Sequence, residues 1–157
     1  MRIAFFSLGN MGFPIAENLL KSGFSVTTAT HRNPEPTLRL QALGGRIAPS
    51  PAEAVKDAEF IFTIVPEDSA LLELLLDPEL ADAVAPGTVI VDMTSASPKA
   101  VQTVAEFYAP RGVAVLDAPI LLKSALLSWR KFPQNLILLI WVLSVYLLKN
   151  LFHVKGY

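Results

Sequence analysis

Two glycines near the start of the chain have the spacing of a loop that binds phosphate groups. The six residues Ser7-Leu8-Gly9-Asn10-Met11-Gly12 follow the pattern G-x-G-x-x-G, with serine in the first glycine position. Gly9 would let the backbone approach a pyrophosphate, and Gly12 would let the following helix pack closely against a sheet. The N-terminus of that helix would offer free N–H groups and a positive dipole to the phosphates. The pattern therefore predicts a dinucleotide site, and an ordinary glycine turn is the alternative.

A second group of residues bears on the choice of dinucleotide. Thr30-His31-Arg32-Asn33 stands about 20 residues beyond the glycine loop, where an acidic residue would bind the ribose 2′-hydroxyl of NAD. Arg32 would instead pair with a 2′-phosphate, so the sequence predicts NADP as the cofactor. A solvated loop arginine is the alternative for Arg32, and His31 would either stack near the adenine or lie exposed.

The hydrophobic pattern predicts the elements that position these residues. Short runs of apolar or β-branched residues predict strands over residues 2–6, 25–30, 60–65, 88–91 and 113–116. Helical spacing or helix-start signals predict helices over residues 11–22, 34–43, 50–56, 69–76, 78–84 and 97–108. This alternation is typical of an α/β fold of the Rossmann type, with a doubly wound parallel sheet. Such sheets bind ligands at the carboxyl ends of their strands, so the functional residues should directly follow the strands.

Four segments carry a resemblance to a known family. They are LGNMGFPIAENLLKSG at 8–23, TIVPED at 63–68, VDMTSASP at 91–98 and LDAP at 116–119. On these segments residues 1–119 resemble the N-terminal domain of the β-hydroxyacid dehydrogenases, which include 3-hydroxyisobutyrate dehydrogenase and 6-phosphogluconate dehydrogenase. The resemblance implies an NADP-binding domain. In the full-length family it implies hydride transfer between NADP and a 3-hydroxy acid or semialdehyde.

The resemblance also implies which residues contact the cofactor. The matching positions are Leu8, Gly9, Asn10, Met11 and Gly12 in the phosphate loop, His31, Arg32 and Asn33 near the 2′-phosphate, Val65 and Pro66 along the cofactor, and Thr94 and Ser95 near the nicotinamide ribose. A strand terminator is the alternative for Val65 and Pro66. A helix cap or turn is the alternative for Thr94 and Ser95.

The segment after Pro119 departs from the family pattern. The family continues with a Ser-Gly-Gly turn at the substrate carboxylate, whereas this chain continues with Ile120-Leu121-Leu122-Lys123. No lysine beyond Pro119 lies in the family's Gly-x-x-x-Lys-x-x-Asn context. We therefore assign no catalytic residue and expect an apparently truncated cofactor-binding domain. Whether the chain is itself an enzyme stays open.

The composition changes at the same place, so we divide the chain into a domain over 1–119 and a tail over 120–157. The last acidic residue is Asp117, and residues 136–148 carry no charge. This stretch predicts an apolar helix of about 20 Å, short of the roughly 30 Å core of a membrane. The tail could pack on the sheet, mediate self-association or enter a membrane. A membrane-associated or interaction protein on a Rossmann scaffold is therefore the alternative function.

Charge and composition exclude several other kinds of site. The 157 residues include 13 Lys and Arg against 14 Asp and Glu, and a net charge of −1 argues against nucleic-acid binding by bulk charge. The absence of cysteine excludes thiolate chemistry, and two histidines do not suggest a metal site. A chain without cysteine or a signal-peptide pattern fits a cytoplasmic protein.

Overall fold

The computed structural model describes residues 1–30 and 33–119 of the chain. The strands in this part are β1 (Arg2–Phe6), β2 (Ser25–Ala29), β3 (Arg46–Ala48), β4 (Phe60–Thr63), β5 (Val89–Asp92) and β6 (Ala114–Asp117). The helices are α1 (Gly12–Lys21), α2 (Glu35–Ala42), α3 (Pro51–Val55), α4 (Asp68–Leu75), α5 (Pro78–Ala83) and α6 (Pro98–Tyr108), with a 3-10 turn η1 (Ala109–Arg111) after α6.

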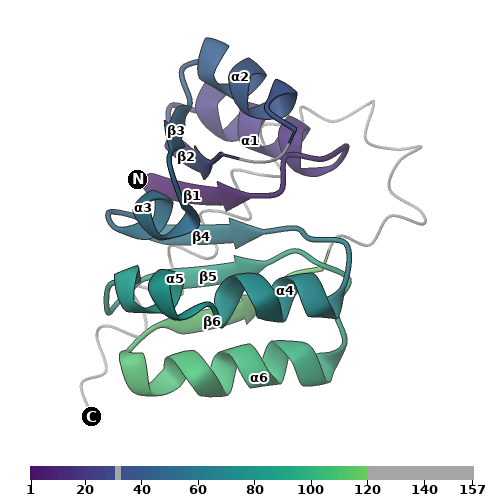
Figure 1. Cartoon of the computed structure of the whole chain (residues 1–157), viewed down its shortest axis with the longest axis vertical. Helices are drawn as coiled ribbons and strands as arrows, with labels where there is room; N and C mark the ends of the chain where they lie inside the picture. Colours follow the sequence, from purple (N-terminus) through teal and green to yellow (C-terminus); the bar gives the residue numbers. More distant parts are fainter. Residues whose placement is uncertain (31–32, 120–157) are drawn as a thin grey trace. The chain divides into compact units, whose positions relative to one another are not determined.

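The strands form one parallel sheet in the order β3-β2-β1-β4-β5-β6 (Figure 1). The order reverses between β1 and β4, which is the doubly wound Rossmann arrangement, so the predicted α/β fold is confirmed. The predicted strands omitted β3, because a run of three residues is too short to show a period. The tail over 120–157, and with it the predicted division into two domains, lies outside the described residues.

Local sequence signals explain where several helices begin. Three helices start with a side-chain cap followed by proline, a residue that tolerates the first helical position because its missing N–H has no partner there. The caps are Ser50, which accepts a hydrogen bond from the Glu53 amide (3.2 Å), Asp77, which accepts from the Leu80 amide (2.9 Å), and Ser97, which accepts from the Ala100 amide (3.3 Å). The predicted starts at Ser50 and Ser97 are therefore confirmed.

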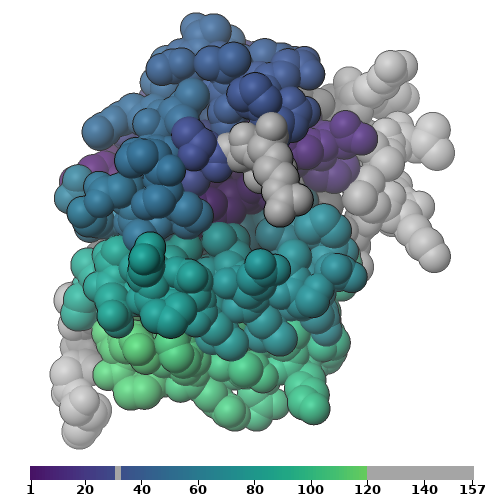
Figure 2. All heavy atoms as spheres, in the orientation of Figure 1, coloured from purple at the N-terminus to yellow at the C-terminus, as the bar shows by residue number. Residues whose placement is uncertain are grey.

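The helices cover the two halves of the sheet differently. In Figure 1, α4 and α5 are drawn over the part of the sheet that contains β5 and β6, and α6 lies beside β6, whereas α1 and α2 lie at the β1–β3 end. Figure 2 shows the teal and green atoms of α4, α5 and α6 packed against one another. The strands β4 and β5 are buried along their whole length, as expected for central strands of a parallel sheet.

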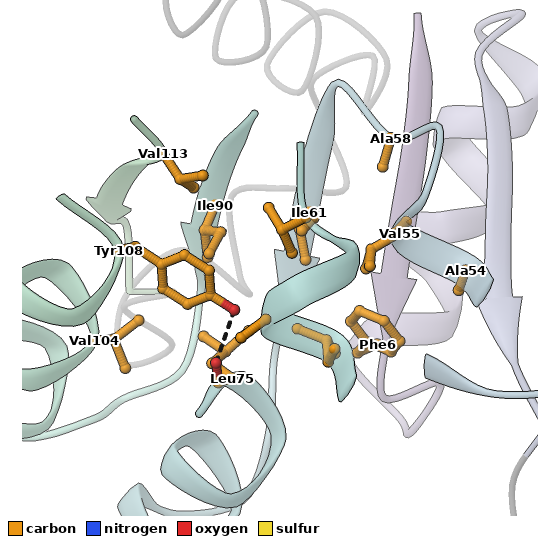
Figure 3. Close-up of a cluster of buried hydrophobic side chains, with 14 of the residues drawn as sticks. Phe6, Ala54, Val55, Ala58, Ile61, Leu75, Ile90, Val104, Tyr108 and Val113 are labelled. Atoms are coloured by element: carbon orange, nitrogen blue, oxygen red, sulfur yellow. Dashed lines mark hydrogen bonds between the residues drawn. The ribbon is translucent and has the colours of Figure 1, made fainter. Parts of the chain in front are cut away.

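A buried tyrosine joins two of these helices at the end of the sheet where the strands begin. Tyr108, the last residue of α6, is fully buried among Ile90, Val104 and Val113 (Figure 3). Its hydroxyl donates a hydrogen bond to the carbonyl of Leu75, the last residue of α4, at 2.8 Å. Burial raises the pKa of Tyr108 to about 12, so the hydroxyl keeps its proton and the bond throughout the neutral range.

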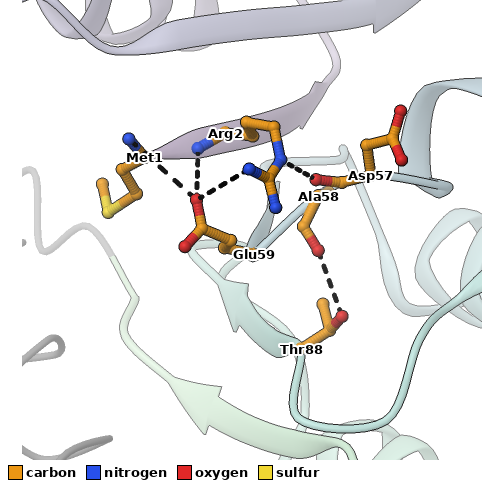
Figure 4. A network of polar contacts seen from close by, with 6 residues as sticks. All are labelled: Met1, Arg2, Asp57, Ala58, Glu59 and Thr88. Carbon is orange, nitrogen blue, oxygen red and sulfur yellow. Dashed lines mark hydrogen bonds and ion pairs between the residues drawn. The ribbon is translucent and has the colours of Figure 1, made fainter.

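A polar network joins β1 and β4 at this amino edge (Figure 4). The Arg2 amide donates to a Glu59 carboxylate oxygen at 2.9 Å, and Arg2 Nε donates to the Asp57 carbonyl at 2.6 Å. Thr88, just before β5, donates its hydroxyl to the Ala58 carbonyl at 3.1 Å. These contacts fix the amino edge, which leaves the loops at the carboxyl edge as the place for a site.

Candidate functional site

The carboxyl ends of β1 and β4 lie side by side where the strand order reverses. Phe6 at the end of β1 pairs with Thr63 at the end of β4. In open α/β sheets the crevice at such a switch point is where ligands bind. The loop after β1 and the loop after β4 are therefore the first candidates for a binding site.

The turn after β1 has an unusual backbone at its first residue. Ser7 has φ 73°, the left-handed region that glycine adopts most readily. This conformation brings the Ser7 carbonyl so close to α1 that a Cβ on Gly12 would lie 1.9 Å from the oxygen and 3.0 Å from Ile64 Cγ2. Residue 12 must therefore be glycine for α1 to start beside the ends of β1 and β4. Ser7 stands where the G-x-G-x-x-G pattern has its first glycine. The turn accommodates the serine, but in a strained left-handed backbone conformation.

Gly9 lies in a different environment from Gly12. It is exposed, and a Cβ placed there would meet no atom of the described residues within 4 Å. Its carbonyl accepts the hydrogen bond from the Phe13 amide at 3.0 Å, so the loop leads directly into α1. Asn10 beside it is exposed, and Leu8 and Met11 are half-buried. The open space at Gly9, in front of a helix N-terminus, fits the close approach of a pyrophosphate.

The end of β2 is the second predicted region. β2 ends at Ala29, and the Thr30 hydroxyl donates to the Pro49 carbonyl at 3.0 Å. Asn33 is exposed, and its side-chain oxygen accepts from the Glu35 amide at 3.2 Å at the start of α2. His31 and Arg32 lie outside the described residues. Because β2 pairs with β1 in parallel, its end reaches the same edge as the glycine loop.

Val65 and Thr94 come together although they are far apart in sequence. Val65 follows β4, Thr94 follows β5, and the Val65 amide donates to Thr94 Oγ1 at 3.1 Å. Thr94 is 1% exposed, so its hydroxyl is turned into the protein, whereas Ser95 and Pro66 are exposed. Of the two hydroxyls predicted near the nicotinamide ribose, Ser95 is thus the one in contact with solvent.

Sequence reasoning missed two buried residues beneath these loops. Asp92, the last residue of β5, accepts hydrogen bonds at Oδ1 from the Thr63 hydroxyl (2.8 Å) and the Thr94 amide (3.0 Å). Thr63 is 0% exposed and Asp92 is 1% exposed. The signal was an acidic residue at the end of the apolar run VIVD, where a charge is costly without partners.

A second contact joins the same two loops nearer the surface. Asp68, the first residue of α4, accepts hydrogen bonds from both the hydroxyl and the amide of Ser97, which caps α6. These two bonds, the hydroxyl one first, lower the pKa of the Asp68 carboxyl below its usual 3.8. The carboxylate is therefore charged at neutral pH and holds the starts of α4 and α6 together.

Nothing else in the described part of the chain points to a different binding site. A hollow of about 170 Å³ lies beside α3 and the first strands, but it mixes Arg2 and Arg46 with Glu53 and Asp57 and so has no consistent charge. No three His, Asp or Glu side chains gather there as a metal site would need. Within the same residues, no helix is long and apolar enough to cross a membrane.

The comparisons with known proteins agree with this geometry. A family model described as the NAD binding domain of 6-phosphogluconate dehydrogenase matches residues 2–121. The chain is 35% identical over 119 residues to 3-hydroxyisobutyrate dehydrogenase of Pseudomonas aeruginosa, a match that covers 75% of this chain and 40% of that protein.

Two solved structures have the same fold and contain different ligands. The structure of 3-hydroxyisobutyrate dehydrogenase of Mycobacterium tuberculosis with L-serine has a TM-score of 0.69 at 29% identity, covering 74% of this chain and 39% of that one. The imine reductase of Myxococcus stipitatus in complex with NADP+ has a TM-score of 0.68 at 25% identity, covering 74% and 40%. The chain thus spans about 40% of the length of each of these three proteins.

Proposed function

Because the chain belongs to the family of the NAD-binding domain of 6-phosphogluconate dehydrogenase, we propose that its first 119 residues bind NADP across the carboxyl edge of the sheet. The observation that carries this proposal is the glycine loop. Among the described residues a Cβ at Gly9 would meet no atom within 4 Å, which leaves the loop open to a ligand, whereas at Gly12 there is no room for a side chain. The pyrophosphate would accept hydrogen bonds from the amides at the start of α1.

The preference for NADP rests on Arg32. An acidic residue at the end of the second strand would repel a 2′-phosphate, whereas a guanidinium pairs with it through two parallel hydrogen bonds. The parallel pairing of β2 with β1 supports this assignment, because it brings the end of β2 to the edge where the glycine loop lies.

We also propose that this domain serves an oxidoreductase related to 3-hydroxyisobutyrate dehydrogenase, which acts on a 3-hydroxy acid or the matching semialdehyde. The nicotinamide would supply or accept the hydride. The part of this chain would be to bind and orient the cofactor. Val65 and Pro66 would line it, and the exposed Ser95 hydroxyl would donate a hydrogen bond to the ribose.

Direct binding measurements test the proposal. NADPH and NADH are titrated into the full chain and followed by nicotinamide fluorescence and by calorimetry. We expect NADPH to bind more tightly, and Arg32→Asp to weaken NADPH binding by about tenfold to a hundredfold, since a charge-assisted hydrogen bond contributes about 1.5–3 kcal/mol. NADH should bind as well or more tightly, because an acidic residue at this position can bind the ribose 2′-hydroxyl, so the preference should narrow or reverse.

Arg46→Asp is the matched control, because Arg46 is exposed at the amino end of β3 and the substitution changes the charge equally. It should leave both affinities near the wild-type values. Equal affinity of the unaltered chain for NADPH and NADH would contradict the role of Arg32. Failure to bind either dinucleotide would overturn the proposal as a whole.

A further inference from the structure

A buried polar network lies directly beneath the loops that follow β4 and β5. The Thr63 hydroxyl and the Thr94 amide both donate to Asp92 Oδ1, at 2.8 and 3.0 Å. All three residues are at most 1% exposed. The network joins the last residues of two neighbouring strands, 29 positions apart in sequence.

This network extends to Val65, a half-buried residue in the loop after β4. Asp92 holds the backbone of Thr94, and the hydroxyl of Thr94 in turn accepts the hydrogen bond from the Val65 amide at 3.1 Å. A backbone hydrogen bond also joins the ends of β4 and β5, since the Met93 amide donates to the Thr63 carbonyl at 2.8 Å. The loop of β4 therefore takes its geometry from the loop of β5 through Thr94.

The two oxygens of the buried Asp92 carboxyl group are used differently. Within the described part of the chain, Asp92 Oδ2 is buried and has no hydrogen-bond partner. A buried carboxylate oxygen without a partner costs free energy, but an apolar residue in its place would leave the Thr63 hydroxyl and the Thr94 amide without an acceptor. What the carboxylate contributes is two accepted hydrogen bonds at a single oxygen, one from each strand end.

On this basis we propose that Asp92 and Thr94 are positioning residues for the nicotinamide half of the bound dinucleotide. The inference rests on the proposed function. In a doubly wound sheet the two halves of a dinucleotide lie on either side of the switch point. The glycine loop and the end of β2 would serve the adenosine half. The loops after β4 and β5, which the bond between the Val65 amide and Thr94 joins, would then serve the other half.

The experiment compares a whole dinucleotide with a probe of one half. NADPH and 2′,5′-ADP are titrated into the full chain and into its Thr94→Val, Thr94→Ser and Asp92→Asn variants. Thr94→Val keeps the shape of the side chain but removes the acceptor of the Val65 amide. It should weaken NADPH binding about tenfold, which is the change in affinity that corresponds to the loss of one hydrogen bond. Binding of 2′,5′-ADP should not change.

The conservative variants Thr94→Ser and Asp92→Asn should retain NADPH binding. Thr94→Ser retains a hydroxyl, and Asp92→Asn retains an oxygen that accepts from Thr63 and Thr94, so both should bind NADPH within about twofold of the wild type. Asp92→Ala removes the acceptor and should show the same selective loss as Thr94→Val. If Asp92→Ala does not fold, the NADPH and 2′,5′-ADP affinities of Thr94→Val test the inference on their own.

Tyr108→Phe separates positioning from general stability. It removes a buried hydrogen bond at the opposite edge of the same helical layer, and it should lower the unfolding midpoint without changing either affinity. The inference is overturned if Tyr108→Phe weakens NADPH binding as much as Thr94→Val does. It is also overturned if folded Thr94→Val binds NADPH like the wild type or loses both ligands equally.

The outcome for the unaltered chain distinguishes the two proposals. If it binds neither NADPH nor NADH, the proposed function fails and this inference fails with it. If it binds NADPH and the Thr94 variants do not separate the two halves, the proposed function stands and only the positioning role is wrong.

Discussion

At the scale of single residues, Gly9 and Gly12 lie in different environments. At Gly12 a Cβ would lie 1.9 Å from the Ser7 carbonyl oxygen, a backbone atom that moves only if the turn moves. At Gly9 a Cβ would meet no atom of the residues that the structure describes within 4 Å, so its cost would appear only if a ligand occupied that space. Gly12 therefore meets a folding requirement, whereas the requirement proposed for Gly9 is one of cofactor binding.

Substitution of each glycine by alanine should separate these requirements. Gly12→Ala should lower the free energy of unfolding by about 1–3 kcal/mol, the range for overpacked sites, as measured by urea unfolding. Gly9→Ala should leave the unfolding free energy within about 0.5 kcal/mol of the wild type, as for other exposed sites. Its NADPH affinity should fall about tenfold or more, because the methyl group occupies the space of the pyrophosphate. Full NADPH affinity in Gly9→Ala would show that the cofactor does not approach this loop.

At the scale of elements, the contact between Asp68 and Ser97 joins the start of α4 to the start of α6. The pKa of Asp68 is lowered in the folded protein by the two hydrogen bonds from Ser97. A carboxyl group with a lowered folded pKa stabilises the fold at pH values above its unfolded pKa of about 4. This contribution is lost as the pH falls through the lower folded value.

The stability difference between the wild type and Asp68→Asn should therefore depend on pH. Urea unfolding at pH 7 and pH 5 should show the wild type to be the more stable protein by a constant amount. The difference should shrink as the pH falls below about 4, because the wild-type carboxyl then becomes neutral like the amide. A difference that stays constant down to pH 2 would contradict a charged Asp68 in the folded state. Glu73→Gln on the same helix, where Glu73 is exposed, is the control.

At the scale of the whole molecule, cofactor binding and turnover should be separable. We expect the isolated chain to bind NADPH but to show no hydride transfer with 3-hydroxy acids or semialdehydes. A hydroxy acid needs a group within about 3 Å to take its proton and a fixed orientation toward the nicotinamide. No lysine of residues 120–157 lies in the family's catalytic context.

A spectrophotometric assay of NADPH formation and consumption checks this expectation, with the Pseudomonas aeruginosa relative as positive control. Turnover above the rate without enzyme would contradict it. If Lys123→Ala or another single lysine substitution in residues 120–157 then abolished that turnover, the tail would contain the catalytic base.

The sequence by itself determined the fold class and most of the candidate site. The reasons are local: buried strands such as FIFT and VIVD are continuous apolar runs, and the helices begin at side-chain caps such as Ser50 and Ser97. The glycine loop was also visible, because its chemistry is contained in six consecutive residues. Once a parallel sheet is expected, the loops after its strands lie at one edge by geometry alone.

Only the tertiary structure decided which residues hold that edge together. The left-handed backbone of Ser7 and the collision that forbids a side chain at Gly12 arise where α1 meets the sheet. The pairing of Asp92 with Thr63 joins positions 29 apart, and it exists only because β4 and β5 are neighbours in a particular register. Hydrophobic periodicity indicates which residues of one segment are buried. It contains no information about which polar group on another strand will form a hydrogen bond with a buried residue such as Asp92.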